Sequence, residues 1–195
     1  MYEEQQKAAL WRMRPETAVK DLQTCRMGIL GYGAIGRQCA HLAQAFGVEV
    51  YAYTKNPRLT TESRIHAGYC MQGTGDVNGL IPAKCTHHLI SHKQFKIMSA
   101  KKTFLINVAR GPIIDTDALI EALNQGLLSG AALDVTDPEP LPDSHPLWGA
   151  PNVMITPHIS WQSAALPQRA LDLLFQNLER LDKGGPLLNT TPKMV

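Results

Sequence analysis

The sequence has few cysteines, few aromatic residues and no long hydrophobic run. Its four cysteines among 195 residues, Cys25, Cys39, Cys70 and Cys85, show neither the close pairing of a metal site nor the density of a disulfide scaffold. No apolar stretch approaches the roughly 18 residues needed to cross a bilayer, and the polar N-terminus is unlike a signal peptide. We therefore expect a soluble protein of a reducing compartment, the cytoplasm, with no membrane partner.

Charge of one sign is not concentrated anywhere along the chain. The formal net charge is +2, from 19 Lys and Arg against 17 Asp and Glu, and aromatic residues make up only 6%. A nucleic-acid-binding surface usually requires a basic run or basic residues interleaved with aromatic ones. The sequence therefore predicts no nucleic-acid partner.

What the sequence does contain is a regular alternation of short apolar strands and amphipathic helices. The alternation begins after Pro15, which ends a helix predicted for residues 2–13. Strand, helix and strand succeeding one another in this way predict an α/β fold with a Rossmann-like, doubly wound parallel sheet. The expected strands are residues 26–30, 48–53, 104–108, 130–135 and 153–156, and the expected helices are residues 34–46, 91–98, 115–124 and 166–181.

Residues 56–89 interrupt this alternation. The stretch is rich in Gly, Thr and Pro and has no apolar run long enough for a buried strand, so we expect no strand there. A structureless connection of such length is unusual inside a compact domain. It indicates a wrong assignment, a mobile loop or missing sequence.

Gly31, Gly33 and Gly36 form a G-x-G-x-x-G pattern directly after the first predicted strand. The first glycine permits a tight turn, the second lets the backbone approach a pyrophosphate, and the third lets the helix pack closely on the strand. The helix that begins at Ala34 and Ile35 offers its first N–H groups and the positive end of its dipole to phosphates. Glycines alone can mark a simple turn, but the strand before them and the helix and strand after them favour dinucleotide binding.

The choice between NAD and NADP depends on the residues that follow the second strand. An acidic residue there would bind the ribose hydroxyls and repel a 2′-phosphate. The stretch instead carries Thr54, Lys55 and Arg58 and no carboxylate, so these three residues are candidate ligands of the 2′-phosphate. We predict NADP as the preferred cofactor and NAD as the alternative. Otherwise the two cations are ordinary exposed loop residues.

Three further segments place polar residues just beyond predicted strand ends, where doubly wound folds bind their ligands. The residues of interest are Asn107, Val108 and Arg110 after one strand, Asp134 and Glu139 after the next, and His158 after the third.

Around a nicotinamide these side chains suit hydride transfer at a carbonyl group, for which the protein must orient the substrate and deliver a proton. Arg110 can bind a substrate carboxylate through two parallel hydrogen bonds. Because histidine as a residue type titrates near neutral pH, His158 is the natural acid, with Glu139 as its partner. Asp134 can hold the carboxamide of the nicotinamide. Each residue also has a purely structural alternative: a surface pair or cap for Arg110, a loop or turn position for Glu139 and Asp134, and a packing role for His158.

Four motifs make the sequence similar to the D-isomer-specific 2-hydroxyacid dehydrogenases. They are GYGAIG at 31–36, NVARG at 107–111, DVTDPEPL at 134–141 and TPH at 156–158, in the order of the family. The resemblance implies an oxidoreductase that reduces 2-oxo acids and pairs as a homodimer through its nucleotide-binding domain. It also implies Arg110 as the substrate clamp and Glu139 with His158 as the proton relay. The residues that it implies near the cofactor are Gly31, Gly33, Ile35, Thr54, Asn107 and Asp134.

Two departures from the family pattern shape the remaining expectations. The family builds a substrate-binding lobe mainly from sequence ahead of the glycine loop, and only 25 residues precede Arg26 here. The family also has a further strand, helix and strand before the segment THHLI at 86–90. We therefore expect no separate substrate lobe, a sheet that lacks one or two strands, one of them beside the first strand, and weak or no turnover. A noncatalytic dinucleotide-binding or interaction module is the alternative.

These considerations predict three parts of the chain. Residues 1–24 form an N-terminal helical linker, residues 25–165 form the NAD(P)-binding Rossmann domain, and residues 166–195 form a C-terminal helix and tail.

Overall fold

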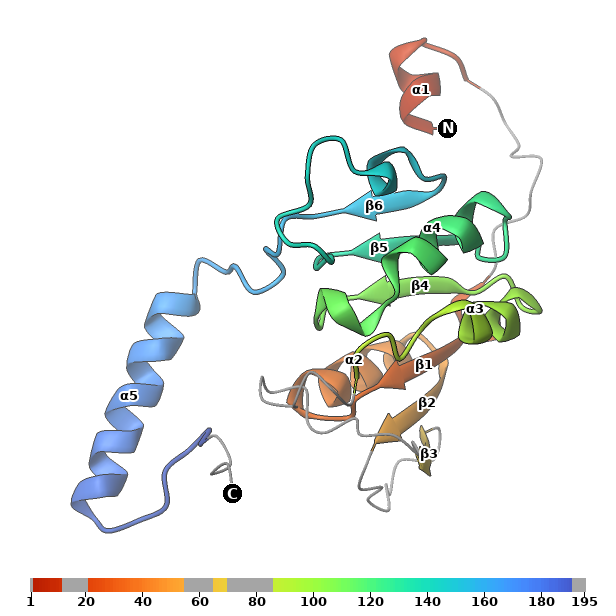
Figure 1. Ribbon diagram of the computed structural model, residues 1–195. Helices are drawn as coiled ribbons and strands as arrows, with labels where there is room; N and C mark the ends of the chain where they lie inside the picture. The colour runs from red at the N-terminus through yellow and green to blue at the C-terminus, as the bar shows by residue number, and fades with distance from the viewer. Residues whose placement is uncertain (1, 12–20, 55–64, 70–85, 191–195) are drawn as a thin grey trace. The chain divides into compact units, whose positions relative to one another are not determined.

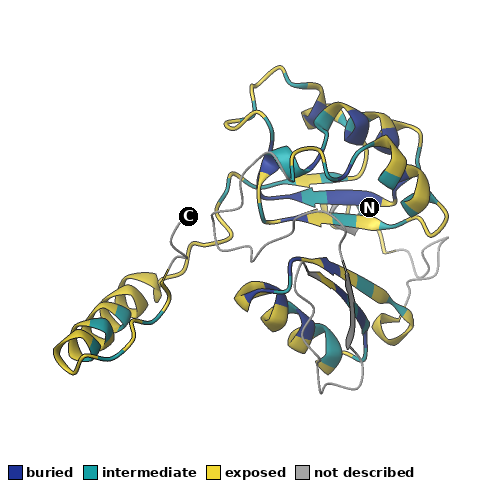
Figure 2. Cartoon of the chain, turned by 60° about the horizontal axis from the view of Figure 1, so that its bottom comes forward, coloured by how far each residue is buried: buried dark blue, intermediate teal, exposed yellow. Residues whose placement is uncertain are grey.

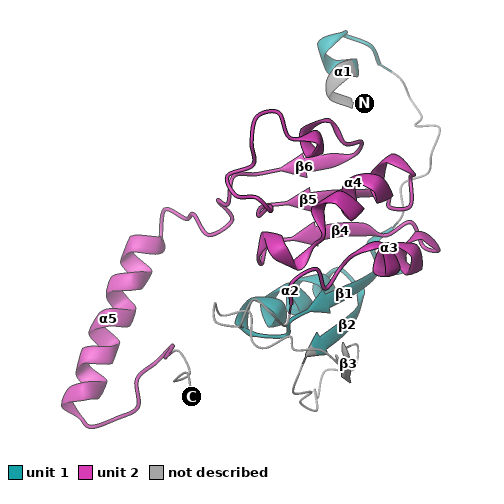
Figure 3. Cartoon of the chain, viewed as in Figure 1, with its two compact units in different colours: residues 1–69 teal, residues 70–195 magenta. Residues whose placement is uncertain are grey.

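A computed structural model describes residues 2–11, 21–54, 65–69 and 86–190 (Figure 1). The chain divides into two compact units, an N-terminal unit of residues 1–69 and a C-terminal unit of residues 70–195 (Figure 3). Each unit contains a three-stranded sheet whose strands all run parallel. The prediction of an α/β fold with parallel strands is confirmed, although the described strands form two sheets and not one.

The N-terminal unit is a small strand, helix, strand arrangement. Its elements are α1 (Tyr2–Lys7), η1 (Leu22–Thr24), β1 (Arg26–Leu30), α2 (Ala34–Ala45), β2 (Glu49–Thr54) and β3 (Ile65–Tyr69). The sheet has the order β1-β2-β3. Ile29, Val50 and Ala52 of the strands and Ala40 of α2 form its core. The unit thus has the βα turn on which the predicted cofactor loop depends.

Helix α2 turns mainly small residues toward the strands. Gly36 and Ala40 are its buried residues, whereas Ile35, Leu42 and Phe46 are each more than half exposed. A helix can approach a sheet closely only where its facing side chains are small. Close packing at the glycine loop therefore leaves the larger apolar residues of α2 outside the core of this unit.

Strand β3 shows that the prediction of no strand in residues 56–89 was wrong. Ile65 to Tyr69 pair in parallel with Val50 to Thr54. The segment IHAGY is short and contains a glycine, and its pairing with an existing strand supplies hydrogen bonds that its composition does not signal. Residues 55–64 and 70–85 lie outside the described part of the chain. Within that part, β1 pairs with β2 on one side and ends the sheet on the other.

The C-terminal unit begins, as far as the structure describes it, at Thr86. Its elements are α3 (His92–Ser99), β4 (Phe104–Asn107), η3 (Gly111–Ile113), α4 (Thr116–Asn124), β5 (Gly130–Leu133), η4 (Pro146–Gly149), β6 (Val153–Ile155) and α5 (Leu166–Asp182). The sheet order is β4-β5-β6, with Asn107 paired to Leu133 and Leu133 paired to Ile155. The carboxyl ends of all three strands therefore lie at one edge of this sheet.

Helices α3 and α4 pack on the sheet of the C-terminal unit and complete its core. Phe95 of α3, Leu119 and Leu123 of α4, and Ala131 and Leu133 of β5 are all buried (Figure 2). Ser91 and Asp115 are the N-caps of these helices, at the residues where the two helices were predicted to begin. Helix α5 has no buried residue, and none of the described helices is both long and apolar enough to span a membrane.

The caps of α3 and α4 are joined to each other. Ser91 forms a capping box with Gln94, and its hydroxyl also donates to Asp115 at 2.8 Å. Asp115 in turn accepts from the Ala118 N–H at the start of α4. Burial alone would raise the pKa of Asp115, but these two hydrogen bonds and the nearby histidines lower it below its ordinary value. Asp115 therefore stabilises the folded unit as a carboxylate.

Candidate active site

The glycine loop of the N-terminal unit has a backbone conformation that requires glycine at its first position. Gly31 has a φ of 97°, in the left-handed region that side chains rarely adopt. Its N–H donates to the Tyr53 carbonyl oxygen at 2.9 Å, which ties the end of β1 to the end of β2. Gly33 is buried and is the N-cap of α2. The chain thus turns sharply from β1 into the helix.

Gly36 fixes how closely α2 lies against that turn. An added Cβ at this position would lie 2.3 Å from the Gly31 carbonyl oxygen and 3.3 Å from Cγ2 of Ile29. No side chain fits there, so the helix begins directly against the loop. Ala34 and Ile35 form the first turn of α2, where the N–H groups have no partner within the helix. The geometry fits the pyrophosphate of a dinucleotide, which binds such N–H groups and the positive end of the helix dipole.

The residues predicted to select the cofactor are only partly described. Thr54 is the last residue of β2, at the carboxyl end of the strand, as the prediction requires. Lys55 and Arg58 lie outside the described residues. The assignment of these three residues to a 2′-phosphate stays a prediction.

In the C-terminal unit the predicted residues follow the carboxyl ends of β4, β5 and β6. Asn107 is the last residue of β4 and is buried. Its side-chain amide donates to the Arg110 carbonyl oxygen at 2.9 Å, and its side-chain oxygen accepts from the Ala109 N–H at 3.1 Å. Asn107 therefore shapes the loop that carries Arg110. Val108, in the same loop, is about half exposed at 51%.

Arg110 is exposed just after this braced loop. Its guanidinium donates to the Ala109 carbonyl oxygen at 2.6 Å. It forms no ion pair with a carboxylate of the described residues, so the surface pair considered as an alternative is not present there. The following Gly111 lies so close to the loop after β5 that an added Cβ would be 1.8 Å from the Thr136 carbonyl oxygen. The loops that carry Arg110 and Glu139 are therefore in direct contact.

Glu139 and His158 form the closest pair of ionisable side chains described at this sheet edge. Nδ1 of His158 lies 2.5 Å from Oε1 of Glu139. The two side chains are 42% and 40% exposed, so both partly face solvent while they contact each other. The pairing orients the imidazole and leaves its other nitrogen, Nε2, to interact with a ligand. The sequence predicted this pair although the two residues are 19 positions apart.

Asp134 organises the loop that holds His158. Its Oδ1 accepts from the Thr156 hydroxyl at 2.6 Å and from the Ile159 N–H at 3.0 Å, and its Oδ2 accepts from the Ser160 N–H at 2.9 Å. Burial would raise the pKa of Asp134, but the hydrogen bonds from Thr156, Ser160 and Ile159 outweigh it and hold the pKa well below its ordinary value. The described contacts therefore give this carboxylate a structural role in the loop, and a contact with the nicotinamide stays a prediction.

Sequence reasoning missed the donors that surround Asp134. Thr156 was noted only as part of the TPH motif, and Ser160 was not singled out. A buried carboxylate at a strand end needs several donors, and a hydroxyl at the end of the neighbouring strand is the signal that could have identified Thr156.

The arrangement in the C-terminal unit can bind an anion and transfer a proton. An exposed guanidinium can bind a carboxylate, and a histidine held by a glutamate can act as general acid or base. The glycine loop belongs to the other unit.

Comparisons with known proteins identify the family of the chain. Residues 1–160 match the model of the D-isomer specific 2-hydroxyacid dehydrogenase NAD binding domain. The hydroxypyruvate reductase of Blautia hydrogenotrophica is 36% identical over 186 residues, which are 91% of this chain and 58% of that protein. The glyoxylate reductase of Thermofilum pendens is 36% identical over 171 residues, 84% of this chain and 50% of that protein. The chain thus spans half to three fifths of the length of these relatives.

Solved structures are similar over nearly the whole chain. A D-isomer specific 2-hydroxyacid dehydrogenase family protein from Aeromonas salmonicida has a TM-score of 0.81 and 32% identity, covering 98% of this chain and 62% of that one. A dehydrogenase of the same description from Xanthobacter autotrophicus, in complex with NADPH and MES, has a TM-score of 0.76 and 27% identity, covering 98% and 79%. Together with the glycine loop and the Glu139–His158 pair, these matches show that the chain belongs to the D-isomer specific 2-hydroxyacid dehydrogenase family and carries its NAD-binding domain.

Proposed function

We propose that this chain takes part in the NADPH-dependent reduction of a small 2-oxo acid to the 2-hydroxy acid. The observation that carries the proposal is the contact between His158 Nδ1 and Glu139 Oε1 at 2.5 Å. The carboxylate fixes the orientation of the imidazole, and a general acid must be held in a fixed orientation toward its substrate. The names of relatives, hydroxypyruvate reductase and glyoxylate reductase, support a substrate of two or three carbons.

Three residues of the C-terminal unit would each have a separate role in the reaction. Arg110 binds the carboxylate of the 2-oxo acid, because its guanidinium is exposed and has no carboxylate partner among the described residues. His158 donates the Nε2 proton to the substrate oxygen, while Glu139 holds Nδ1 and stabilises the charged imidazolium. When bound, the reduced nicotinamide supplies the hydride that the carbonyl carbon accepts. One hydride and one proton convert the C=O group to CH–OH.

The glycine loop and the end of β2 would hold the cofactor. Gly31 and Gly33 form the turn into α2, and Gly36 lets the helix begin close against that turn, so the pyrophosphate would lie at the start of α2. NADPH is proposed over NADH because Thr54, Lys55 and Arg58 offer a hydroxyl and two cations where an NAD-specific protein carries an acid. A similar structure from Sinorhizobium meliloti, an NADPH-dependent glyoxylate/hydroxypyruvate reductase in complex with NADP and sulfate, supports this choice at 25% identity and a TM-score of 0.78.

We also propose that the protein acts in the cytoplasm as a homodimer, without a membrane or nucleic-acid partner. The low cysteine content and the evenly mixed charge support this setting. Pairing through the nucleotide-binding domain is what the family resemblance implies.

The test combines cofactor titration with a single-turnover assay at excess protein, which detects even slow chemistry. We expect NADPH to bind more tightly than NADH, and glyoxylate or hydroxypyruvate to trigger NADPH oxidation. His158→Gln should slow that oxidation by about 10²-fold or more, the usual contribution of a general acid. His92→Gln is the matched control, because His92 is exposed in the same unit and its ion-pair partner among the described residues is Glu121.

Two results would contradict the proposal. Equal oxidation rates for the native chain and His158→Gln would exclude His158 as the acid. NADPH binding without any oxidation in the presence of either 2-oxo acid would leave a dinucleotide-binding module and overturn the catalytic part.

A further inference from the structure

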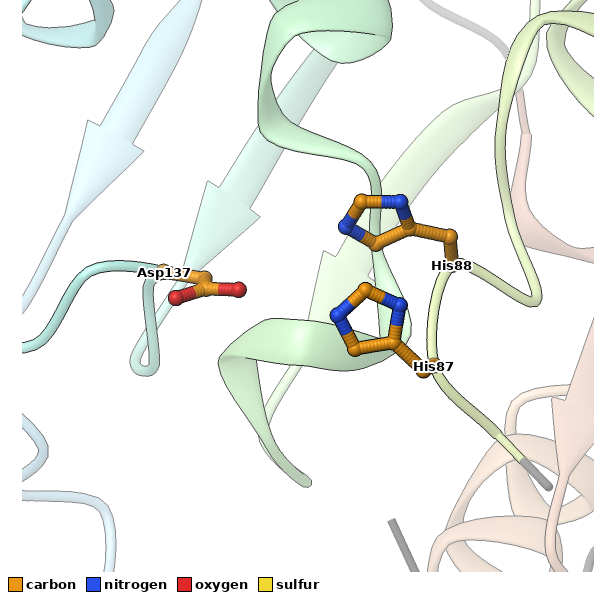
Figure 4. Close-up of side chains that lie close together, drawn as sticks. All are labelled: His87, His88 and Asp137. Carbon is orange, nitrogen blue, oxygen red and sulfur yellow. The ribbon is translucent and has the colours of Figure 1, made fainter. Parts of the chain in front are cut away.

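A second group of ionisable side chains lies at the same edge of the C-terminal sheet and is not used by the chemistry above. His87 and His88 precede α3, and Asp137 follows β5 (Figure 4). Each side chain has one nitrogen or oxygen atom that lies within 4.8 Å of the corresponding atom of the other two. We propose that these three residues bind a divalent transition-metal ion, with zinc as the reference case.

The donor set is suited to such an ion. Imidazole nitrogen suits zinc, copper, nickel and iron, and a carboxylate completes the two-histidine, one-carboxylate sets found in several metal sites. Magnesium and calcium prefer oxygen ligands and are poorly matched to two histidines. Three protein ligands leave at least one position for water, so the ion would be exchangeable.

The side chains already converge on one point. Three atoms that lie within 4.8 Å of one another have a point within about 2.8 Å of all three, and zinc takes such ligands at about 2.0–2.2 Å. Each ligand atom would therefore move inward by less than about 1 Å. His87 and His88 are exposed and Asp137 is half-buried, so small side-chain rotations supply that movement.

The two imidazole rings are stacked in an arrangement that presents both to the same ligand. Their centroids are 3.9 Å apart and the rings are inclined by 27°. Figure 4 shows one nitrogen of each ring on the side that faces the carboxylate of Asp137. A shared cation between the rings and Asp137 gives their convergence a reason.

The carboxylate of Asp115 lies near one nitrogen of the His88 ring. Nδ1 of His88 is 3.8 Å from Oδ2 of Asp115, which leaves Nε2 for the ion. Histidine ligands of metals commonly donate a hydrogen bond from their other nitrogen to a carboxylate, and Asp115 would have to approach His88 by less than about 1 Å to accept one. Among the described residues, the carboxylate of Asp137 has neither a hydrogen bond nor an ion pair of its own. It is therefore available as a ligand.

The backbone holds the two segments of the proposed site together. The His88 N–H donates to the Pro112 carbonyl oxygen at 2.8 Å, and the Thr116 hydroxyl donates to the Asp137 carbonyl oxygen at 2.9 Å. Both segments are thus anchored to the stretch from η3 to the first residue of α4. The ligands come from positions about 50 residues apart, yet they do not depend on a flexible chain end for their approach.

The test is titration of the full, tag-free chain with Zn²⁺ by calorimetry and with Co²⁺ by visible absorption. We expect one site that takes Zn²⁺ and Co²⁺ but not Mg²⁺. His88→Ala and Asp137→Asn should each weaken Zn²⁺ binding at least about tenfold, the lower end of what even an outer partner of a ligand contributes. His92→Ala should bind as the native chain does, because His92 lies on α3 outside the group.

Three outcomes would overturn the proposal. They are absence of Zn²⁺ binding by a folded chain, Zn²⁺ binding that Asp137→Asn leaves unchanged, and an intense near-ultraviolet Co²⁺ band from thiolate ligands, which would place the ion on cysteines. Asp137→Asn keeps the shape of the side chain, and circular dichroism of each variant separates lost ligands from lost structure. None of these measurements uses NADPH, so their failure leaves the proposed reductase function untouched.

Discussion

Gly36→Ala is the substitution whose consequences the structure predicts most directly. The new Cβ would lie 2.3 Å from the Gly31 carbonyl oxygen and 3.3 Å from two further atoms, one in the backbone of Gly31 and one in the side chain of Ile29. The nearest atom is backbone, so a side-chain rotation cannot relieve the clash. Either α2 moves away from β1 or the glycine loop changes shape, and both responses disturb the pyrophosphate site.

The expected magnitude follows from two opposing effects. Overpacking of this kind costs about 1–3 kcal/mol, whereas alanine in a helix is favoured over glycine by about 1 kcal/mol. The net loss is then up to about 2 kcal/mol in the free energy of unfolding of the N-terminal unit. For a unit of fewer than 100 residues, each kcal/mol lowers the melting temperature by about 4–8 °C. NADPH affinity should fall as well, because the glycine loop either changes shape or lies farther from the start of α2.

Gly28→Ala is the matched control for this substitution. Gly28 lies in β1 of the same unit, and an added Cβ there meets nothing within 4 Å. Replacing a glycine inside a strand by alanine stabilises by about 0.5–1 kcal/mol. Amide hydrogen exchange of peptides from β1 to β2, together with NADPH titration, measures both effects in the unit concerned. Equal exchange and equal affinity for Gly36→Ala and Gly28→Ala would refute the close packing assigned to the loop.

Two predictions concern the carboxylates of the C-terminal unit. The pKa of Asp134 is lowered in the folded state, so its stabilising contribution is present above the ordinary carboxyl pKa and is lost as the pH falls through the folded-state value. In urea unfolding at acid pH, the stability of Asp134→Asn should therefore fall less steeply with pH than that of the native chain. An equal fall in both proteins would contradict this prediction. Asp115→Ala removes the N-cap acceptor of the Ala118 N–H and should cost about 1 kcal/mol. Thermal melting measures that loss, and Asp117→Ala, in the same helical turn but not at the cap, is its control.

The boundaries of a helix or strand could be predicted from the sequence where local signals and tertiary packing favour the same residues. Ser91 and Asp115 are strong N-cap residues, and the structure uses both, so α3 and α4 begin where they were predicted to begin. Strand β1 was predicted with its observed bounds because it is a short apolar run directly before a glycine turn. In these elements propensity, capping and tertiary packing all favour the same boundaries.

Features that depend on distant partners were missed. Strand β3 forms because β2 offers a free edge, and nothing in IHAGY itself predicts that pairing. The division of the strands into two sheets depends equally on partners, since a strand carries no local signal of which neighbour it will bind. The convergence of His87 and His88 on Asp137 brings together residues about 50 positions apart. The Glu139–His158 pair was predicted because both residues follow strand ends at one edge of the sheet and also belong to recognisable motifs.

The two roles considered for Asp134 are connected through His158. His158 has a φ of 53°, a left-handed conformation that costs a residue with a side chain about 1–3 kcal/mol. Its N–H is held by the carbonyl oxygens of Asp134 at 2.8 Å and Thr156 at 3.0 Å, and the Asp134 carboxylate holds the residues on either side. Contacts of Asp134 and Thr156 therefore maintain this strained conformation. Since the same turn directs the imidazole to Glu139, the structural role of Asp134 is also what places the proposed acid.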